Sequence, residues 1–529
     1  MSLGLRLVGV VCAVSLLDVQ HPLVSRAASI GPSARRPWLR AAPRAPRAPP
    51  AALARRAPPA RACARLSGAA AAAENAAEGG EGMPFSARAC VFAVQFSEAV
   101  QSMMIFPFLP FMMEGFGVPP AQLGVAAGAL SSSYCFASFI ATPIVSSLSD
   151  TVGVRQTMLF TIAVGLCSTF AFGMAPSYRL ALVARIVAGS MNGNISILKA
   201  FIARTTSGTR RVKAFGLLTL AFGCGAVIAP ATGGLLARPA ALYPATFGRL
   251  PLFRAQPYLL PCLVCMAVQF AALLTAYVAL PRTPAAGDAR AAAAGAATPE
   301  VPPAARAGLR ERLAFLRERA PLLACGAYAL DCFINVLYDL AVPLLLKSAL
   351  CDGGLGLSMR EIGCVLSAAS IGLFGSLPLQ APLTQRVGTR RSLAWANFLL
   401  LPVFLLLPAL ALLRRYSLSP AASPAVAAIV FPALVVTLAL INCFGTLGFT
   451  LGNVLVNSSV PPSQLAMING FSQSLSALAR GFAPIVGGLI VSISAHMRVG
   501  GQFVVFAFMG LVALLAGAVV KSVPQADDA

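Results

Sequence analysis

Three acidic side chains stand inside long apolar stretches of this sequence. Glu98 lies about midway along the apolar residues 87–113, and Asp331 and Asp339 lie within the apolar residues 319–347. Burial in apolar surroundings disfavours the charged form of a carboxyl, so such a group can hold a proton in one state of a protein and release it in another. These side chains therefore predict proton binding in an apolar environment.

Basic and amide side chains recur at helical spacing in similar stretches. One predicted helix face carries Arg185, Gly189, Asn192, Ser196 and Lys199, where the last four follow the first by 4, 7, 11 and 14 residues. A guanidinium inside an apolar span is costly and usually faces a cavity or a partner. Three further polar faces carry Asp331, Asn335 and Asp339; Asn442, Thr446, Asn453 and Asn457; and Asn469, Gln473, Ser476 and Arg480.

Structural roles would also explain these charged residues. Glu98 could neutralise Arg185 or Lys199, and Asp339 could pair with Arg480 as a strut between two helices. Asp331 could lie near a membrane surface and be solvated there. The residue types alone leave these alternatives open.

The elements that position these residues are membrane-spanning helices. Of 529 residues, 58% are apolar and 11% are charged, which excludes disorder for most of the chain and disfavours a soluble globule. Apolar runs of about twenty residues predict an all-α membrane protein with 12 transmembrane helices. We expect spans at about 87–113, 120–147, 157–175, 178–204, 212–237, 257–281, 319–347, 360–385, 391–413, 424–456, 463–495 and 499–521.

These spans divide into two sets of six, which predicts two pseudo-symmetric halves at residues 85–281 and 319–521. A polar central loop, 282–318, joins them, and a short tail, 522–529, follows. The formal net charge of +23 does not indicate nucleic-acid binding, because many basic residues lie in short loops where they set topology. Their distribution modestly favours placing both chain ends and the central loop in the cytoplasm.

Residues 1–84 read as a targeting segment or tail outside the fold. An eleven-residue apolar run, Leu7 to Leu17, suits a signal-peptide core, and residues 26–65 contain ten Arg and no acid, as a transit peptide would. Together they resemble the bipartite plastid address of algae with complex plastids. A disordered cytoplasmic tail is the alternative, in which case the protein would belong to a vacuolar or plasma membrane.

Two loops at equivalent places resemble the signature loop of the major facilitator superfamily, Gly-x-Leu-x-Asp-Arg-x-Gly-Arg-Arg. The loop after the second span matches at Leu148, Asp150, Gly153 and Arg155, and the loop after the eighth span repeats the pattern with Gln385 in place of the acid. Gly permits a tight turn, and Asp and Arg can form charge pairs between helix ends that hold a gate shut. The predicted gating residues are Asp150, Gly153, Arg155, Arg386, Gly388 and Arg390.

The fifth span resembles the superfamily's proton-antiporter motif, Gly-x8-Gly-x3-Gly-Pro-x2-Gly-Gly. The matching positions are Gly216, Gly225, Pro230, Gly233 and Gly234, with Ala229 for one Gly. Small residues let helices touch closely, and Pro bends a span. The eleventh span echoes the end of the motif with Ala483-Pro484 and Gly487-Gly488. Generic small-residue packing is the alternative.

Finer features resemble the zinc-induced-facilitator-like branch of the superfamily. They include Phe96-Ser97-Glu98, the segment 189–193 with Lys199, and Arg480 four residues before Pro484, where that branch has Lys. This chain lacks the branch's early Cys-rich motif and a His-rich loop, so zinc is in doubt as a substrate. In the superfamily spans 1, 4, 7 and 10 line a central cavity. The resemblance thus implies a midplane cavity lined by Glu98, Gln101, Arg185, Asn192, Lys199, Asp331, Asn335, Asp339, Asn442, Gln473 and Arg480.

We therefore expect a secondary transporter that moves a small solute by alternating access, most simply by proton-coupled antiport in the direction of export. A facilitative or symporting carrier of a metabolite or organic anion is one alternative, and a non-transporting receptor or scaffold is another. With two His and no ATP-binding loop in the sequence, an enzyme, a His-based metal centre and ATP-driven transport are disfavoured. The expected partners are the lipid bilayer, protons and a small-molecule or ion substrate, with no cofactor, no metal, no nucleic acid and a monomeric chain.

Overall fold

A computed structural model describes residues 83–206, 208–280, 317–418, 424–461, 464–494, 497 and 500–524. The predicted targeting segment, except for its last two residues, and most of the central loop lie outside these ranges. The described residues form helices and turns without any strand. Eleven helical segments among them are long and apolar enough to cross a membrane. The first predicted span is not among these eleven, because it is divided into two shorter helices, α3 and α4.

Six spans make the N-terminal half. They are α3 (Phe85–Met103) with α4 (Leu109–Gly115), α5 (Leu123–Thr151), α6 (Val154–Gly173), α7 (Tyr178–Ser190) with α8 (Asn194–Thr205), α9 (Gly208–Leu236) and α13 (Leu259–Ala279). A 3-10 turn, η1 (Pro120–Gln122), precedes α5. Three short helices lie between α9 and α13, namely α10 (Pro239–Leu242), α11 (Pro244–Phe247) and α12 (Pro251–Ala255).

Six spans also make the C-terminal half. They are α17 (Arg319–Lys347), α18 (Met359–Ala369) with α19 (Ile371–Arg386), α20 (Thr389–Ser417), α21 (Pro424–Ser458), α22 (Leu465–Ser494) and α23 (Gly501–Lys521), with a 3-10 turn, η3 (Leu350–Asp352), after α17. Each begins and ends close to its predicted bounds, because the ends of apolar runs mark where the chain leaves the bilayer.

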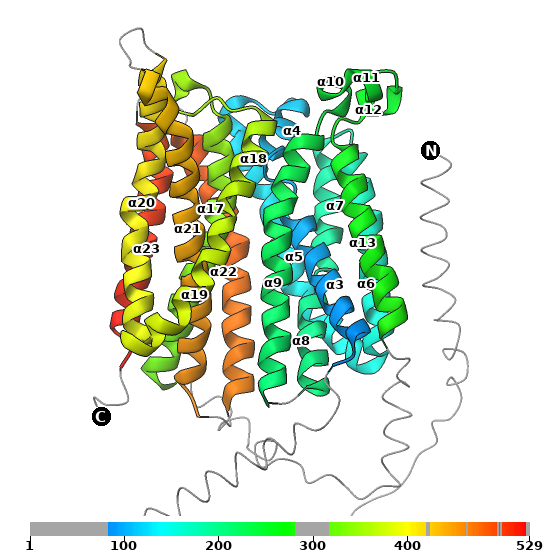
Figure 1. Cartoon of the computed structure of the whole chain (residues 1–529), viewed down its shortest axis with the longest axis vertical. Coiled ribbons are helices and arrows are strands. Elements are labelled where there is room, and N and C mark those ends of the chain that lie inside the picture. Colours follow the sequence, from blue (N-terminus) through cyan, green and yellow to red (C-terminus); the bar gives the residue numbers. More distant parts are fainter. Residues whose placement is uncertain are drawn as a thin grey trace, which may run out of the picture.

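The two halves stand side by side as two helical bundles (Figure 1). We call the face at which α3 begins and α23 ends the terminal face. The opposite face carries α4, the start of α18 and the short helices α10–α12, at the top of Figure 1. Helices α5 and α22 pack along each other across the halves, as do α9 and α18.

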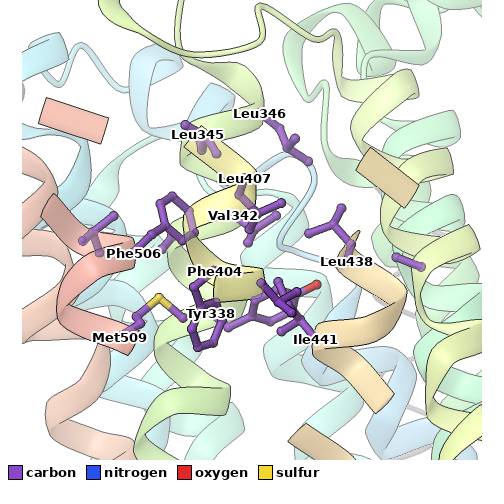
Figure 2. Packing of buried hydrophobic residues seen from close by; sticks show 14 of the residues in the cluster. Tyr338, Val342, Leu345, Leu346, Phe404, Leu407, Leu438, Ile441, Phe506 and Met509 are labelled. Carbon is purple, nitrogen blue, oxygen red and sulfur yellow. The ribbon is translucent and has the colours of Figure 1, made fainter. Parts of the chain in front are cut away.

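Each half has its own apolar core. In the C-terminal half, Tyr338 of α17 lies among Phe404 of α20, Ile441 of α21 and Met509 of α23 (Figure 2). Burial of such side chains contributes about 1.5–3 kcal/mol each relative to exposure to water. In a bilayer, close packing and backbone hydrogen bonds hold helices together, so these cores set the position of each span.

The fourth span is not one continuous helix. We predicted a single helix face from Arg185 to Lys199, but α7 ends at Ser190 and α8 begins at Asn194. Gly193 lies at this break, and a Cβ atom there would approach Val145 of α5 to 2.8 Å. The predicted single helix is therefore interrupted between Arg185 and Lys199, although Arg185, Gly189 and Ser196 all contact α5.

Candidate functional site

The carboxyl group of Glu98 is buried without an ionic partner. Glu98 lies on α3 with 7% of its surface exposed. Neither carboxyl oxygen has a hydrogen-bond partner in the described structure. The amide side chain and backbone of Asn194, at the start of α8, face this carboxyl without forming a hydrogen bond to it. Thr161 of α6 donates to the Asn194 side-chain oxygen over 2.6 Å and so orients the amide.

The guanidinium of Arg185 packs on aromatic rings. Its central carbon lies 4.3 Å from the ring centroid of Tyr134 on α5 and 6.0 Å from that of Phe172. Arg185 is 5% exposed, and its Nε has no hydrogen-bond partner. No described acid lies within ion-pair distance of Arg185, so the alternative in which Glu98 neutralises it finds no support in this conformation. Cation–π contact stabilises a guanidinium without neutralising its charge.

Gln101 belongs to a hydrogen-bonded ladder inside the N-terminal half. Its side-chain amide donates to Thr169 of α6 over 3.0 Å, and the Thr169 hydroxyl lies 3.3 Å from the side-chain oxygen of Gln269 on α13. The next residue of α3, Ser102, contacts the hydroxyl of Tyr134 at 3.2 Å. The ladder fixes α3 against its neighbours and so holds Glu98 in place.

Charged residues of both halves meet around Cys135 of α5. The charges of Arg185 on α7, Arg480 on α22 and Asp339 on α17 all act on its thiol. Lys199 on α8 is exposed and lies close enough to Arg480 for the two like charges to act on each other. Asp339 and Arg480 form no ion pair within 4.0 Å, so the predicted strut is absent from this conformation. We refer to Arg185, Lys199 and Arg480 as the cation cluster.

Asp331 lies inside the C-terminal half, apart from the cation cluster. It is 3% exposed and lines a small cavity with Asn335, Tyr338 and Asn397. The volume open to the centre of a water molecule is about 10 Å³, room for roughly one water. Asn335 donates to the backbone carbonyl of Asp331 over 2.8 Å. Asp331 is therefore buried rather than solvated at a membrane surface, and it faces α20 and α21.

The remaining predicted cavity residues have varied surroundings. Asn442 donates to the Tyr338 hydroxyl and to the carbonyl of Ala369, within the C-terminal half. Gln473 lies 3.5 Å from the hydroxyl of Tyr328, on which the charge of Arg480 also acts. Asn192 lies in the break between α7 and α8, where its buried side-chain oxygen has no described partner.

The antiporter-like motif places three glycines of α9, Gly225, Gly233 and Gly234, at close contacts. A Cβ on Gly225 would lie 2.5 Å from that of Ala99 on α3. A Cβ on Gly234 would lie 2.5 Å from the carbonyl oxygen of Met359 on α18, in the other half. Pro230 and Gly233 are buried between these contacts, whereas Gly216 faces open space. Four of the five predicted positions thus pack α9 against neighbours in both halves.

The eleventh span repeats this arrangement with the halves exchanged. Gly488 of α22 meets Gly124 of α5, and a Cβ on Gly124 would lie 2.6 Å from the Gly488 carbonyl oxygen. The hydroxyl of Ser492 accepts a hydrogen bond of 3.2 Å from the Val125 backbone. Lys347 of α17 also pairs with Glu114 of α4. All these contacts lie toward the opposite face, where they hold the halves together.

Just after each signature-like loop, an arginine ties the third span of that half to its last span. Gly153 and Gly388 have φ of 110° and 88°, a conformation that favours glycine, directly before α6 and α20. Two residues later, Arg155 donates to the Tyr277 carbonyl of α13 over 3.1 Å, and Arg390 donates to the Lys521 carbonyl of α23. Arg386 is exposed, and the side chain of Asp150 lies outside the described part.

This architecture matches a known family. A sequence profile described as Major Facilitator Superfamily matches residues 91–350 and 324–528. The chain belongs to the major facilitator superfamily. Members are multi-pass membrane transporters rather than enzymes, so the chain is a membrane carrier with the major facilitator fold.

Relatives within the superfamily carry several transport names. Protein ZINC INDUCED FACILITATOR 1 of Arabidopsis thaliana is 26% identical over 78% of this chain and 85% of its own length. The multidrug transporter mfsB of Aspergillus fumigatus is 33% identical over 35% of this chain and 31% of its own. A solved D-xylose-proton symporter has a TM-score of 0.59 at 13% identity, covering 83% of this chain and 97% of its own, and this likeness concerns the fold alone.

Four residues of the carrier's site were missed from the sequence. Tyr134, Cys135, Asn194 and Asn397 touch or surround the predicted charges. Asn397 lies within the ninth span, so the criterion that selected Asn442 would have found it. Tyr134 and Cys135 give no such signal, because an aromatic ring and a thiol are ordinary in an apolar span.

Proposed function

We propose that this carrier exchanges protons for a small solute and exports that solute. The observation that carries the proposal is Glu98, a buried carboxyl with no hydrogen-bond or ionic partner in the described structure. An unpaired charge in such a place is costly, so the neutral acid is favoured while the site is closed to water. A change that admits water or moves a cation toward Glu98 would release the proton.

Alternating access supplies that change. In this structure α5 with α22 and α9 with α18 make close contacts toward the opposite face. Toward the terminal face, Lys199 is exposed. Ile140 and Ile144, which lie one turn apart on α5, are exposed as well. We infer that the two halves rock against each other, so that contacts open at the opposite face while others close at the terminal face. This movement would expose Glu98 to each side of the membrane in turn. Two relatives named as a multidrug transporter and as a tetracycline resistance protein favour export as the direction.

The test is proton-driven transport by the Glu98→Gln variant. The full chain is reconstituted in liposomes, and solute uptake is measured with and without an imposed pH gradient, with solutes taken from an export screen in cells that lack their own pumps. Glutamine keeps the size of the side chain but cannot exchange a proton, so we expect equal uptake under both conditions. Glu318→Gln, at an exposed position before α17, is the matched control and should keep the gradient dependence.

A Glu98→Gln carrier that remains fully driven by the gradient would remove Glu98 from the proton path. Substrate exchange by Glu98→Gln in the absence of a gradient shows that the variant is folded.

We further infer that the carrier works as a monomer in the bilayer, with both chain ends in the cytoplasm.

A further inference from the structure

An apolar groove runs along α17 between α22 and α23. Its floor extends from Leu322 through Gly326 to Phe333 on α17. Ala479 of α22 and Val519 of α23 belong to its walls, and every residue that lines it is apolar. Gly326 leaves the centre open, because nothing lies within 4 Å of a Cβ atom built there. The volume is about 410 Å³, which is within the range of roughly 300–1,000 Å³ that binds small organic ligands in proteins.

The groove faces the bilayer rather than the centre of the carrier. At about 100° per residue, Asp331 and Asn335 stand about 140° and 180° around α17 from Gly326. These two polar residues line the small cavity on the side of α20 and α21. Beside the groove, Leu478 of α22 is 37% exposed and Leu515 of α23 is 54% exposed. Exposed leucines on two adjoining spans are typical of a surface that contacts hydrocarbon.

The length of the groove matches one leaflet of the bilayer. From Leu322 to Phe333 the helix rises by about 16 Å, at about 1.5 Å per residue. One leaflet of hydrocarbon is about 15 Å thick, half of the ~30 Å core. Because α17 begins at Arg319 and Val519 lies two residues before the end of α23, the groove starts at the terminal face. Its depth and direction therefore fit one acyl chain of the leaflet at that face.

A positive charge lies at the terminal-face end of the groove. Arg319 is exposed and precedes Leu323 and Leu330 by 4 and 11 residues, so it belongs to the face of α17 that forms the floor. The first turn of α17 contains no acid, and the start of a helix favours negative groups. Glu318 directly precedes the helix, but the exposed Arg317 on its other side offsets its charge.

We propose that this groove binds an anionic phospholipid, with one acyl chain along α17 and the phosphate at Arg319. Lipid tails are as apolar as the groove, so close packing rather than the hydrophobic effect holds the chain. The arginine adds a charge-assisted interaction with the phosphate, which favours a lipid of net negative charge over a zwitterionic one by about fivefold. This binding site is separate from the proton site and does not depend on the solute.

A photoreactive lipid locates the site. The full chain is reconstituted in phosphatidylcholine vesicles that contain a trace of phosphatidylglycerol with a diazirine in its acyl chain. After irradiation the adducts are mapped by mass spectrometry, and a phosphatidylcholine with the same diazirine chain is used in parallel. We expect adducts concentrated at the groove residues of α17, α22 and α23, with labelling by the phosphatidylglycerol about fivefold stronger.

Matched substitutions assign the chain and the headgroup separately. Gly326→Leu fills the groove and should lower its labelling by both lipids at least roughly fivefold, whereas Gly375→Leu, at an open position of α19, should not. Ala479→Leu fills the groove from the α22 wall and replaces Gly326→Leu if that variant does not fold. Arg319→Gln should remove the preference for phosphatidylglycerol, whereas Arg391→Gln, exposed at the start of α20, should keep it.

Three results would overturn the proposal. The first is labelling of the groove no stronger than that of other exposed helix faces. The second is equal labelling of the wild-type groove by the two photoreactive lipids. The third is cross-linking to a second copy of the chain in place of lipid adducts. Transport is not measured in this experiment, so its outcome is independent of whether Glu98 exchanges protons.

Discussion

The contact between Gly124 and Gly488 should control which face of the carrier is open. A Cβ atom on Gly124 would lie 2.6 Å from the Gly488 carbonyl oxygen, whereas ordinary contact begins at 3.4 Å, so Gly124→Ala requires α5 and α22 to separate by about 0.8 Å. Overpacking of this kind costs about 1–3 kcal/mol. The cost applies only while the two helices touch, so the equilibrium should shift roughly 5- to 150-fold toward states with the opposite face open.

Spin labels provide the assay for this shift. Labels at Gln122 and Asp352, exposed on the two halves at the opposite face, report their separation by double electron–electron resonance on a background without native cysteines. Gly470→Ala on α22 is the matched control, because its Cβ would meet open space and it carries a comparable gain in helix propensity. Distance distributions that are the same in Gly124→Ala and Gly470→Ala would refute the reasoning.

Three further predictions concern stability. Glu114→Gln removes the ion pair with Lys347, and because Glu114 is 44% exposed we expect a loss of at most ~1 kcal/mol that vanishes in high salt, measured as the thermal midpoint in detergent at two ionic strengths. Arg155→Gln loses the hydrogen bond to the Tyr277 carbonyl and the ring contact at 4.6 Å, so its thermal midpoint should fall by the equivalent of ~1–3 kcal/mol, whereas an unchanged midpoint would contradict this role. Gln269→Leu breaks the ladder that holds α3 and should lower the midpoint by ~1 kcal/mol while leaving solute export measurable in cells.

The spans were predictable because hydropathy alone decides where a chain crosses a bilayer. The break between α7 and α8 was not, because Ser190 to Asn194 interrupts the helix without interrupting the apolar run. Its cause is tertiary: glycines at 189 and 193 let α5 approach so closely that Cβ atoms would meet Tyr134 and Val145. Such a contact between distant segments leaves no trace in a local periodicity.

The candidate site shows the same limit. Asp331 and Asp339 were placed on one helix face, but eight residues at 100° each leave them about 80° apart. That rotation directs Asp331 toward the cavity between α20 and α21, while the charge of Asp339 reaches Cys135 on α5. Residue type and spacing identified the charged groups, but only the packing of neighbouring helices decides which of them meet.

One short helix connects the surroundings of Glu98 with Lys199. Asn194, at the N-terminus of α8, faces the Glu98 carboxyl, and Lys199 lies five residues further along the same helix. A change of charge at Glu98 therefore acts on the residue that begins α8, the helix that also carries Lys199. Exchange of a proton for a solute requires such a link between the two binding sites, since each ligand must alter the affinity for the other by the same factor.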